Sequence, residues 1–128
     1  MSPNVVDLIM EVLEKIDKDF VYIFGSVAKG IENDNSDIDI AFYSRNSYEP
    51  FEIFMLAQSI GKALKREVDF IQLKNSSTVF QKEVVENGIL IYEKDPIKRE
   101  EFEILVFKKY ARLNEERREI INDYGADL

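Results

Sequence analysis

The sequence predicts an α/β (α+β) fold, a small mixed β-sheet flanked by helices. Four short runs of apolar, aromatic and β-branched residues are typical of buried strands. Longer stretches with helical apolar periodicity stand before, between and after them. The chain has 128 residues, of which 45% are hydrophobic, so it can bury a core. We expect one domain over residues 1–128, with a core of about 1–95 and a C-terminal helix of about 96–123.

The first helix is predicted over residues 3–17. Ser2 and Pro3 form a cap and first-turn pair, and apolar residues follow at helical spacing. These residues are Val6, Ile9, Met10, Leu13 and Ile16. The run FVYIF, Phe20–Phe24, predicts the first strand, and Gly25 ends it.

A short helical turn is predicted over Ser26–Gly30, because Ser26 can cap its start. A polar loop then leads to a second strand, Ile38–Tyr43. The next helix is predicted over Glu49–Lys65, where apolar residues again recur at helical spacing. Its stripe comprises Phe51, Phe54, Met55, Ala57, Ile60 and Leu64.

The second half of the chain continues the alternation. A third strand is predicted over Val68–Leu73, a helix over Ser76–Glu86 that an Asn-Gly pair ends, and a fourth strand over Gly88–Tyr92. The last helix is predicted from residue 96 to about 122. One of its faces carries Phe102, Val106, Tyr110, Leu113 and Ile120 or Ile121. Two interpretations of this helix remain open: it packs along the sheet, or part of it docks a partner helix.

Composition excludes several classes of chemistry. The chain has no cysteine and no histidine, which removes disulfides, thiolate and imidazole metal sites, and catalysis by Ser-His or Cys-His pairs. Its formal net charge of −8 disfavours direct binding to nucleic acid. The sequence shows no apolar run long enough to span a membrane and no signal peptide. We therefore expect a cytoplasmic protein that uses carboxylates, Lys/Arg, hydroxyls and the backbone.

Three aspartates stand in or beside apolar strands. Asp37 and Asp39 are two positions apart, so they share one face of the second strand, while Ile38 and Ile40 take the other. Two anions this close repel each other unless a cation neutralises them, and Mg²⁺ prefers such oxygen ligands. Asp69 would lie beside Asp39 if the second and third strands pair. We expect two of these carboxylates to hold metal, and the third to share a second ion or take a proton from an attacking hydroxyl.

The turn after the first strand predicts an anion site. Gly25 permits a sharp turn and a close approach of a ligand to the backbone. Ser26 offers a hydroxyl and a backbone N–H at a helix start, and Lys29 adds positive charge one helical turn on. A nucleoside triphosphate that carries Mg²⁺ is the simplest ligand for this turn and the carboxylates together.

These residues resemble the motif of a known superfamily. Gly25 and Ser26, followed after ten residues by the Asp37-Ile-Asp39 doublet and later by Asp69 on a strand, are similar to the nucleotidyltransferases related to DNA polymerase beta. Within that superfamily, the short chain looks like the minimal nucleotidyltransferases (MNT), the antitoxins of HEPN/MNT toxin–antitoxin pairs.

The resemblance covers residues 1–95 well and the helical tail more loosely, and it implies both an activity and a partner. In that family the antitoxin transfers AMP from ATP to a tyrosine of the HEPN ribonuclease toxin. The three aspartates would then be catalytic and hold Mg²⁺, as two ions, and Gly25, Ser26 and Lys29 would bind the nucleotide. The family usually has arginine at the position of Lys29; lysine keeps the charge but lacks the bidentate fork.

Two other functions remain open at this point. One is an antitoxin that neutralises its toxin by binding alone and has a vestigial or regulatory nucleotide site. The other is a small-molecule nucleotidyltransferase of the aminoglycoside type, although 128 residues leave little room for a second substrate domain. The expected partners are a HEPN-domain toxin and a nucleoside triphosphate, in a homo- or hetero-oligomer, with no direct contact to nucleic acid or membrane.

Overall fold

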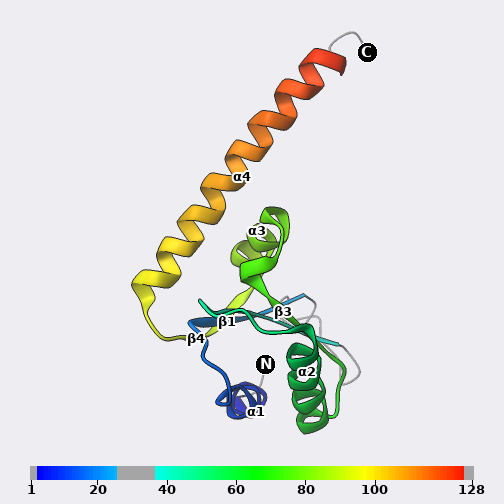
Figure 1. The fold of residues 1–128 in the computed structure, drawn as a ribbon, viewed down its shortest axis with the longest axis vertical. Coiled ribbons are helices and arrows are strands. Elements are labelled where there is room, and N and C mark those ends of the chain that lie inside the picture. Colours follow the sequence, from blue (N-terminus) through cyan, green and yellow to red (C-terminus); the bar gives the residue numbers. More distant parts are fainter. Residues whose placement is uncertain (1–2, 26–36, 126–128) are drawn as a thin grey trace.

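The computed structural model describes residues 3–25 and 37–125. Its helices are α1 (Pro3–Leu13), α2 (Pro50–Leu64), α3 (Thr78–Asn87) and α4 (Pro96–Gly125), and its strands are β1 (Phe20–Phe24), β2 (Ile38–Tyr43), β3 (Val68–Gln72) and β4 (Ile89–Glu93). A single 3₁₀ turn, Leu73–Asn75, follows β3. The predicted fold class is confirmed, because helices cover both faces of one small mixed sheet (Figure 1).

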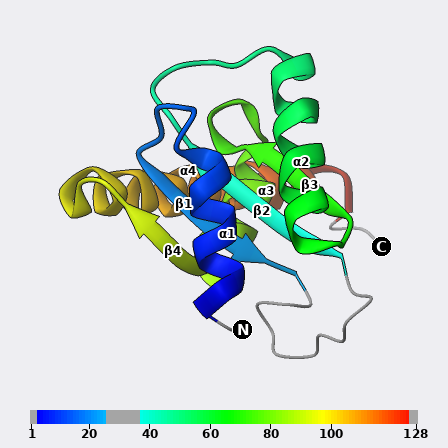
Figure 2. The same ribbon diagram turned by 90° about the horizontal axis from the view of Figure 1, so that it is seen from below.

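The strands lie in the order β3-β2-β1-β4. β1 is antiparallel to both of its neighbours, whereas β2 and β3 run parallel. A parallel pair needs a crossover connection, and α2 provides it. Figure 1 shows α1 and α2 on one face of the sheet and α3 and α4 on the other, and in Figure 2 α1 and α2 lie in front of the strands.

Each face of the sheet packs on its own core, because side chains alternate along the strands. On β2, Ile38, Ile40 and Phe42 face α1 and α2, and they join buried residues of those helices, β1 and β3. This first core comprises Ile9, Leu13, Val21, Ile23, Ile38, Ile40, Phe42, Leu56, Ile60 and Phe70. Ala41 faces the other side and joins a second core of Phe20, Tyr22, Ala41, Leu73 and Val84. Asp39 lies on the same face of β2 as Ala41.

The first helix is shorter than the apolar spacing predicts, since α1 ends at Leu13 rather than at residue 17. Beyond Leu13 the hydrogen-bond pattern changes from i→i−4 to i→i−3. The Ile16 N–H donates to the Leu13 carbonyl at 3.2 Å. Ile16 still packs against the first core. The apolar period therefore continues past the end of the α-helix, into a turn that keeps Ile16 on the core side.

The buried face of α2 differs from the stripe that predicted the helix. Leu56 and Ile60 are buried, whereas Phe51, Phe54 and Met55 are exposed. The helix therefore carries apolar residues on two opposite sides, and only one of those sides contacts the sheet. Helical periodicity alone does not tell which of two such sides is buried.

α4 packs against α3 with its first half and extends beyond the sheet with its second half (Figure 1). Val106 is buried, and the Lys82 amine lies over the Tyr110 ring, 4.8 Å from its centroid. Ile120 and Ile121 are exposed. Packing along the sheet is thus confirmed only at the start of this helix, where Phe102 contacts Phe20 and Tyr43. Docking of a partner helix stays a prediction. None of the described helices, α4 included, carries an apolar stretch long enough to cross a membrane.

A polar network fixes the start of α4 on the sheet. The Tyr22 hydroxyl donates to the Glu103 carboxylate at 2.5 Å, and Arg99 binds both Glu103, at 2.7 Å, and Glu93 of β4, at 2.5 Å. Tyr22 is almost fully buried. Burial and the Glu103 carboxylate raise the pKa of Tyr22, so its hydroxyl stays protonated and keeps donating this hydrogen bond.

We expect Tyr22→Phe to lower the free energy of unfolding by about 1 kcal/mol, because it removes one buried hydrogen bond to a charged group. AMP transfer should change little, since the Tyr22 hydroxyl is bound to Glu103 of α4 and phenylalanine keeps the ring in the second core. Chemical denaturation measures the loss, and a double-mutant cycle with Glu103→Gln assigns it to this pair. Additive effects of the two substitutions would contradict the assignment.

Candidate active site

Asp39 and Asp69 lie directly opposite each other on neighbouring parallel strands. The register pairs Ile38 with Val68 and Asp39 with Asp69, so both aspartates lie on the same face of the sheet. Their side chains are close enough to share a hydrogen bond. The pairing expected from the sequence, with Asp69 beside Asp39, is therefore confirmed by the geometry. Their roles in catalysis remain predictions.

The Asp39 carboxyl is harder to ionise than an ordinary aspartate. Burial, a hydrogen bond with Asp69, and the charges of Asp69 and Asp37 together raise the pKa of Asp39 to about 6. Like charges at this distance favour a shared proton or a bound cation. Perturbed carboxyl groups of this kind cluster at functional sites, which supports a functional role for the pair.

Asp37 lies exposed just before β2, where its charge acts on Asp39. Within residues 3–25 and 37–125, no three acidic side chains gather closely enough to form a ready metal site. The structure brings together a carboxylate pair with a third carboxylate in electrostatic range. Oxygen ligands and unrelieved negative charge are what Mg²⁺ binds, so the donor set fits the ion, and its binding stays a prediction.

Gly25, at the end of β1, packs against the Asp39 side chain. β1 and β2 are paired so that Phe24 is opposite Asp39, and Gly25 then turns away with φ +81°. A Cβ atom at this position would overlap the Asp39 Oδ2 atom and would lie 3.3 Å from its Cγ atom. Only glycine fits both the positive φ and the neighbouring carboxylate. Gly25 therefore lies directly against the Asp39 carboxylate.

Two of the predicted nucleotide-binding residues, Ser26 and Lys29, lie outside the described residues, as does the predicted turn that holds them. Gly25 and the three aspartates are described. The structure thus brings Gly25, Asp39 and Asp69 together at one end of the sheet.

A cavity that the sequence did not reveal opens next to Asp69. It has a volume of about 560 Å³ and lies between α2 and the edge strand β3. Its walls are Ala57, Gln58, Gly61, Lys62, Arg66, Glu67, Val68 and Asp69. Gln58 and Lys62 are one helical turn apart, but ordinary polar residues on a helix give no signal of a site. The cavity lies on the α2 face of the sheet, whereas the Asp39 and Asp69 side chains lie on the face that carries Ala41.

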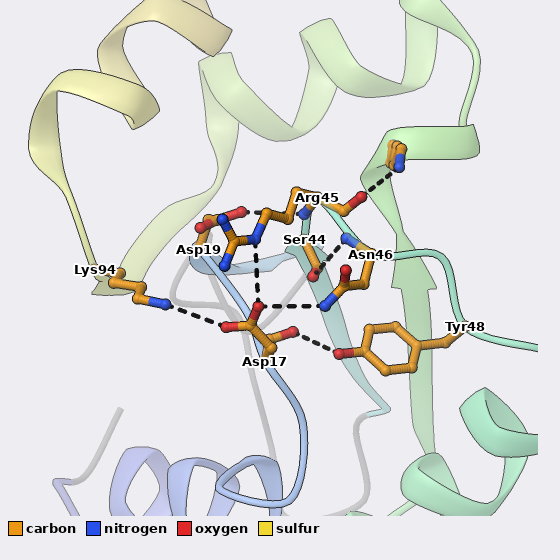
Figure 3. Close-up of polar contacts among 8 residues, drawn as sticks. Asp17, Asp19, Ser44, Arg45, Asn46, Tyr48 and Lys94 are labelled. Carbon is orange, nitrogen blue, oxygen red and sulfur yellow. Dashed lines mark hydrogen bonds and ion pairs between the residues drawn. The ribbon is translucent and has the colours of Figure 1, made fainter.

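A second polar cluster lies at the opposite end of the same strands (Figure 3). The Asp17 carboxylate binds the Lys94 amine at 3.2 Å, the Asn46 amide at 3.2 Å and the Arg45 guanidinium at 3.7 Å. The Tyr48 hydroxyl donates to the Asp17 backbone carbonyl at 2.8 Å. These contacts join the segments before β1, after β2 and after β4. The cluster therefore fixes loops and is separate from the carboxylate pair.

We expect Asp17→Asn to lower the melting temperature at neutral pH. The hydrogen bond from Lys94, with the charges of Lys94, Arg45 and Lys18, lowers the pKa of Asp17. A lowered pKa means that the stabilisation is present above the ordinary value of 3.8 and is lost as pH falls through the folded-state pKa. Melting curves of both proteins at neutral and acidic pH test this. A difference that persists at strongly acidic pH would contradict the electrostatic explanation.

Comparisons with known proteins agree with this geometry. The sequence profile of the family described as "Polymerase beta, Nucleotidyltransferase" matches residues 8–97. The chain belongs to this family of nucleotidyltransferases, and the class of enzyme predicted from its motif is confirmed.

Particular relatives are similar along nearly their whole length. The protein adenylyltransferase MntA of Shewanella oneidensis is 31% identical over 126 residues, which cover 97% of this chain and 87% of the relative. A crystal structure of the toxin–antitoxin with AMP-PNP matches with a TM-score of 0.84 and 31% identity, over 92% of this chain and 96% of the other. The MNT antitoxin in complex with tri-AMPylated Shewanella oneidensis HEPN toxin matches with a TM-score of 0.81 and 28% identity, over 96% and 98%.

Proposed function

We propose that this protein is an antitoxin that transfers AMP from ATP to a tyrosine of a HEPN ribonuclease toxin. The observation that carries this proposal is the Asp39–Asp69 pair, which lies against Gly25 at one end of the sheet. Relatives that cover nearly the whole chain are a protein adenylyltransferase and an MNT antitoxin beside an AMPylated toxin. We further propose a cytoplasmic location and a complex with the toxin.

In the proposed reaction the tyrosine oxygen attacks the α-phosphorus of ATP. A bond forms between these two atoms, the bond from the α-phosphorus to the oxygen that bridges to the β-phosphorus breaks, and pyrophosphate leaves. Asp69 takes the proton of the tyrosine hydroxyl or, as the alternative, shares a second metal ion. The backbone at Gly25 and Ser26, with the Lys29 amine, holds the departing phosphates.

Asp37 and Asp39 would hold Mg²⁺, with Asp69 sharing a second ion. Bound Mg²⁺ supplies positive charge that neutralises the phosphate oxygens. The pair is well suited to this role because burial, with the hydrogen bond and charge of Asp69 and the charge of Asp37, raises the pKa of Asp39, and a bound cation would stabilise the ionised form. ATP and Mg²⁺ are thus the proposed substrate and cofactor.

The test is a mass measurement on a purified HEPN toxin incubated with this protein, ATP and Mg²⁺. We expect the toxin to gain the mass of one or more AMP groups on tyrosine and to lose ribonuclease activity. A toxin that is silenced without any mass gain would overturn the transfer and favour an antitoxin that acts by binding alone. The same reaction with EDTA should yield no mass gain.

A further inference from the structure

We propose that Phe80 and Gln81, in the first turn of α3, are positioning residues for AMP transfer. They are adjacent in the sequence and contact segments on opposite flanks of the carboxylate pair. Phe80 fixes Gly25 beside Asp39, and Gln81 fixes the end of the strand that carries Asp69. The inference rests on the proposed function, and it says which part of the fold sets the distance between Gly25 and Asp69.

α3 lies on the face of the sheet to which the two carboxylates belong. Figure 1 shows α3 on the opposite side of the strands from α1 and α2, and Val84 of α3 joins the second core with Ala41 of β2. Asp39 is two residues before Ala41, so its side chain lies on this face, and the register places Asp69 opposite it. The start of α3 can therefore contact both flanks of the pair.

Phe80 holds the residue that precedes Gly25. The Phe24 and Phe80 rings pack edge to face, with centroids 5.4 Å apart and an interplanar angle of 83°, which is a favourable arrangement for two aromatic rings. Phe24 is opposite Asp39 in the register, and a Cβ atom at Gly25 would overlap the Asp39 carboxylate. A shift of Phe24 would therefore move Gly25 relative to this carboxylate, and the Phe80 ring opposes such a shift.

Gln81 holds the segment that follows β3. Its side-chain amide donates to the Leu73 carbonyl at 2.6 Å, and this hydrogen bond is buried. Leu73 comes directly after β3, whose second residue is Asp69. The Leu73 carbonyl also accepts the Ser76 N–H at 3.1 Å, so it keeps a partner if Gln81 is replaced. The Gln81 amide thus ties the start of α3 to the strand of the second carboxylate.

The start of α3 is itself well anchored. The Ser77 hydroxyl accepts the Phe80 N–H at 3.1 Å and caps the helix. The Gln81 N–H donates to the Ser77 carbonyl at 2.9 Å. Because Phe80 and Gln81 are neighbours in this one turn, they hold the two flanks of the carboxylate pair at a fixed separation.

A matched aromatic contact lies at the other end of the same face. Phe102 of α4 packs against Phe20 and Tyr43, with ring centroids 5.1 and 4.9 Å apart. Phe20 is the first residue of β1 and Tyr43 the last residue of β2, so these rings lie at the end of the strands remote from Gly25 and Asp39. Phe102→Leu therefore removes an aromatic ring from this face without changing a contact to either flank.

The first test separates nucleotide binding from transfer, because the two residues act on different flanks. Phe80→Leu should weaken the affinity for AMP-PNP, measured by calorimetry with Mg²⁺ and without toxin, roughly tenfold, since Gly25 belongs to the proposed phosphate site. Gln81→Met keeps the size of the side chain and removes its donor. It should leave this affinity unchanged and lower kcat for transfer to a HEPN toxin roughly tenfold. Phe102→Leu should lower the melting temperature and change neither quantity.

Each contrary outcome concerns a particular residue. An unchanged affinity for AMP-PNP in Phe80→Leu would overturn the role of Phe80, and an unchanged kcat in Gln81→Met would overturn that of Gln81. Equal changes in Phe102→Leu would overturn both roles, because a general loss of stability would then explain them.

Crystal structures of the variants measure the positions without any transfer. Gly25 should be displaced from the Asp39 carboxylate in Phe80→Leu, and Asp69 should be displaced from Asp39 in Gln81→Met. Phe102→Leu should move neither. Unmoved residues in the first two variants would overturn the inference. If the wild-type protein transfers no AMP to a toxin, the proposed function fails, and these structures still decide whether α3 positions the pair.

Discussion

Asp39→Asn is expected to lose AMP transfer by roughly a thousandfold or more while the protein folds normally. Asparagine keeps the shape of the side chain, the space next to Gly25 and a hydrogen bond to Asp69. It removes the negative charge with which Asp39 is proposed to hold Mg²⁺. Transfer of AMP to the toxin, followed by mass spectrometry, measures the loss. Retention of wild-type transfer would show that Asp39 does not hold the metal.

The same variant should be more stable than the wild type at neutral pH. Because the folded-state pKa of Asp39 is raised to about 6, its ionised form costs stability, and this cost grows as pH rises from the ordinary value of 3.8 through about 6. Solvent screens part of the repulsion, so the gain should be on the order of 1 kcal/mol above pH 6 and absent below pH 3.8. Chemical denaturation of both proteins above pH 6 and below pH 3.8 tests the sign of this stability difference. A less stable variant at neutral pH would contradict it.

Suppression of the toxin by Asp39→Asn in cells distinguishes two kinds of antitoxin. An enzyme that silences its partner covalently should lose protection together with transfer. If the variant still protects cells fully, binding alone is enough, and the carboxylate pair serves another purpose. Tyr22→Phe is a suitable control, because it perturbs the fold modestly and leaves all three aspartates unchanged.

Gly25→Ala is expected to abolish transfer and to lower the free energy of unfolding by roughly 2 kcal/mol. The added Cβ atom would overlap the Asp39 carboxylate, and alanine disfavours φ +81°. Either the carboxylate or the turn must move, and both belong to the proposed site. Denaturation and the transfer assay measure the two effects. Wild-type transfer in this variant would contradict the close packing of Gly25 on Asp39.

A double-mutant cycle separates the two causes in Gly25→Ala. Asp39→Ala removes the carboxylate atoms that the new Cβ atom would meet. The loss from Gly25→Ala should therefore be smaller in the Asp39→Ala background, and the remainder is the cost of the positive φ. Equal losses in both backgrounds would assign the whole effect to the backbone.

The sequence was sufficient for the strands and for the face of its strand on which each aspartate lies. Asp39 and Asp69 each stand between apolar neighbours, so strand alternation places each on the face opposite its core residues. The sequence does not show that these two strands are neighbours, since periodicity does not tell which strands pair or in which direction. The contact of Gly25 with Asp39 follows from the register that pairs Phe24 with Asp39, and no local pattern encodes that register.

The interpretation of α2 shows a second limit. Its sequence places Phe51, Phe54 and Met55 on one side and Leu56 and Ile60 on the other. Both sides satisfy helical periodicity, and the sheet covers only the second. An apolar side that the fold leaves exposed resembles a buried one in sequence, because both follow the same spacing. Tertiary packing alone decides between them.

The crossover through α2 also makes the carboxylate pair depend on a contact between segments that are far apart in the sequence. β1 and β2 pair antiparallel, but β3 can join β2 only after the whole of α2 has crossed the sheet. This longer closure carries a larger entropic cost. We therefore expect a partly folded chain to bring Gly25 and Asp39 together while Asp69 is still apart from them. If Asp69 is the proposed base, such a chain could not yet deprotonate the acceptor hydroxyl.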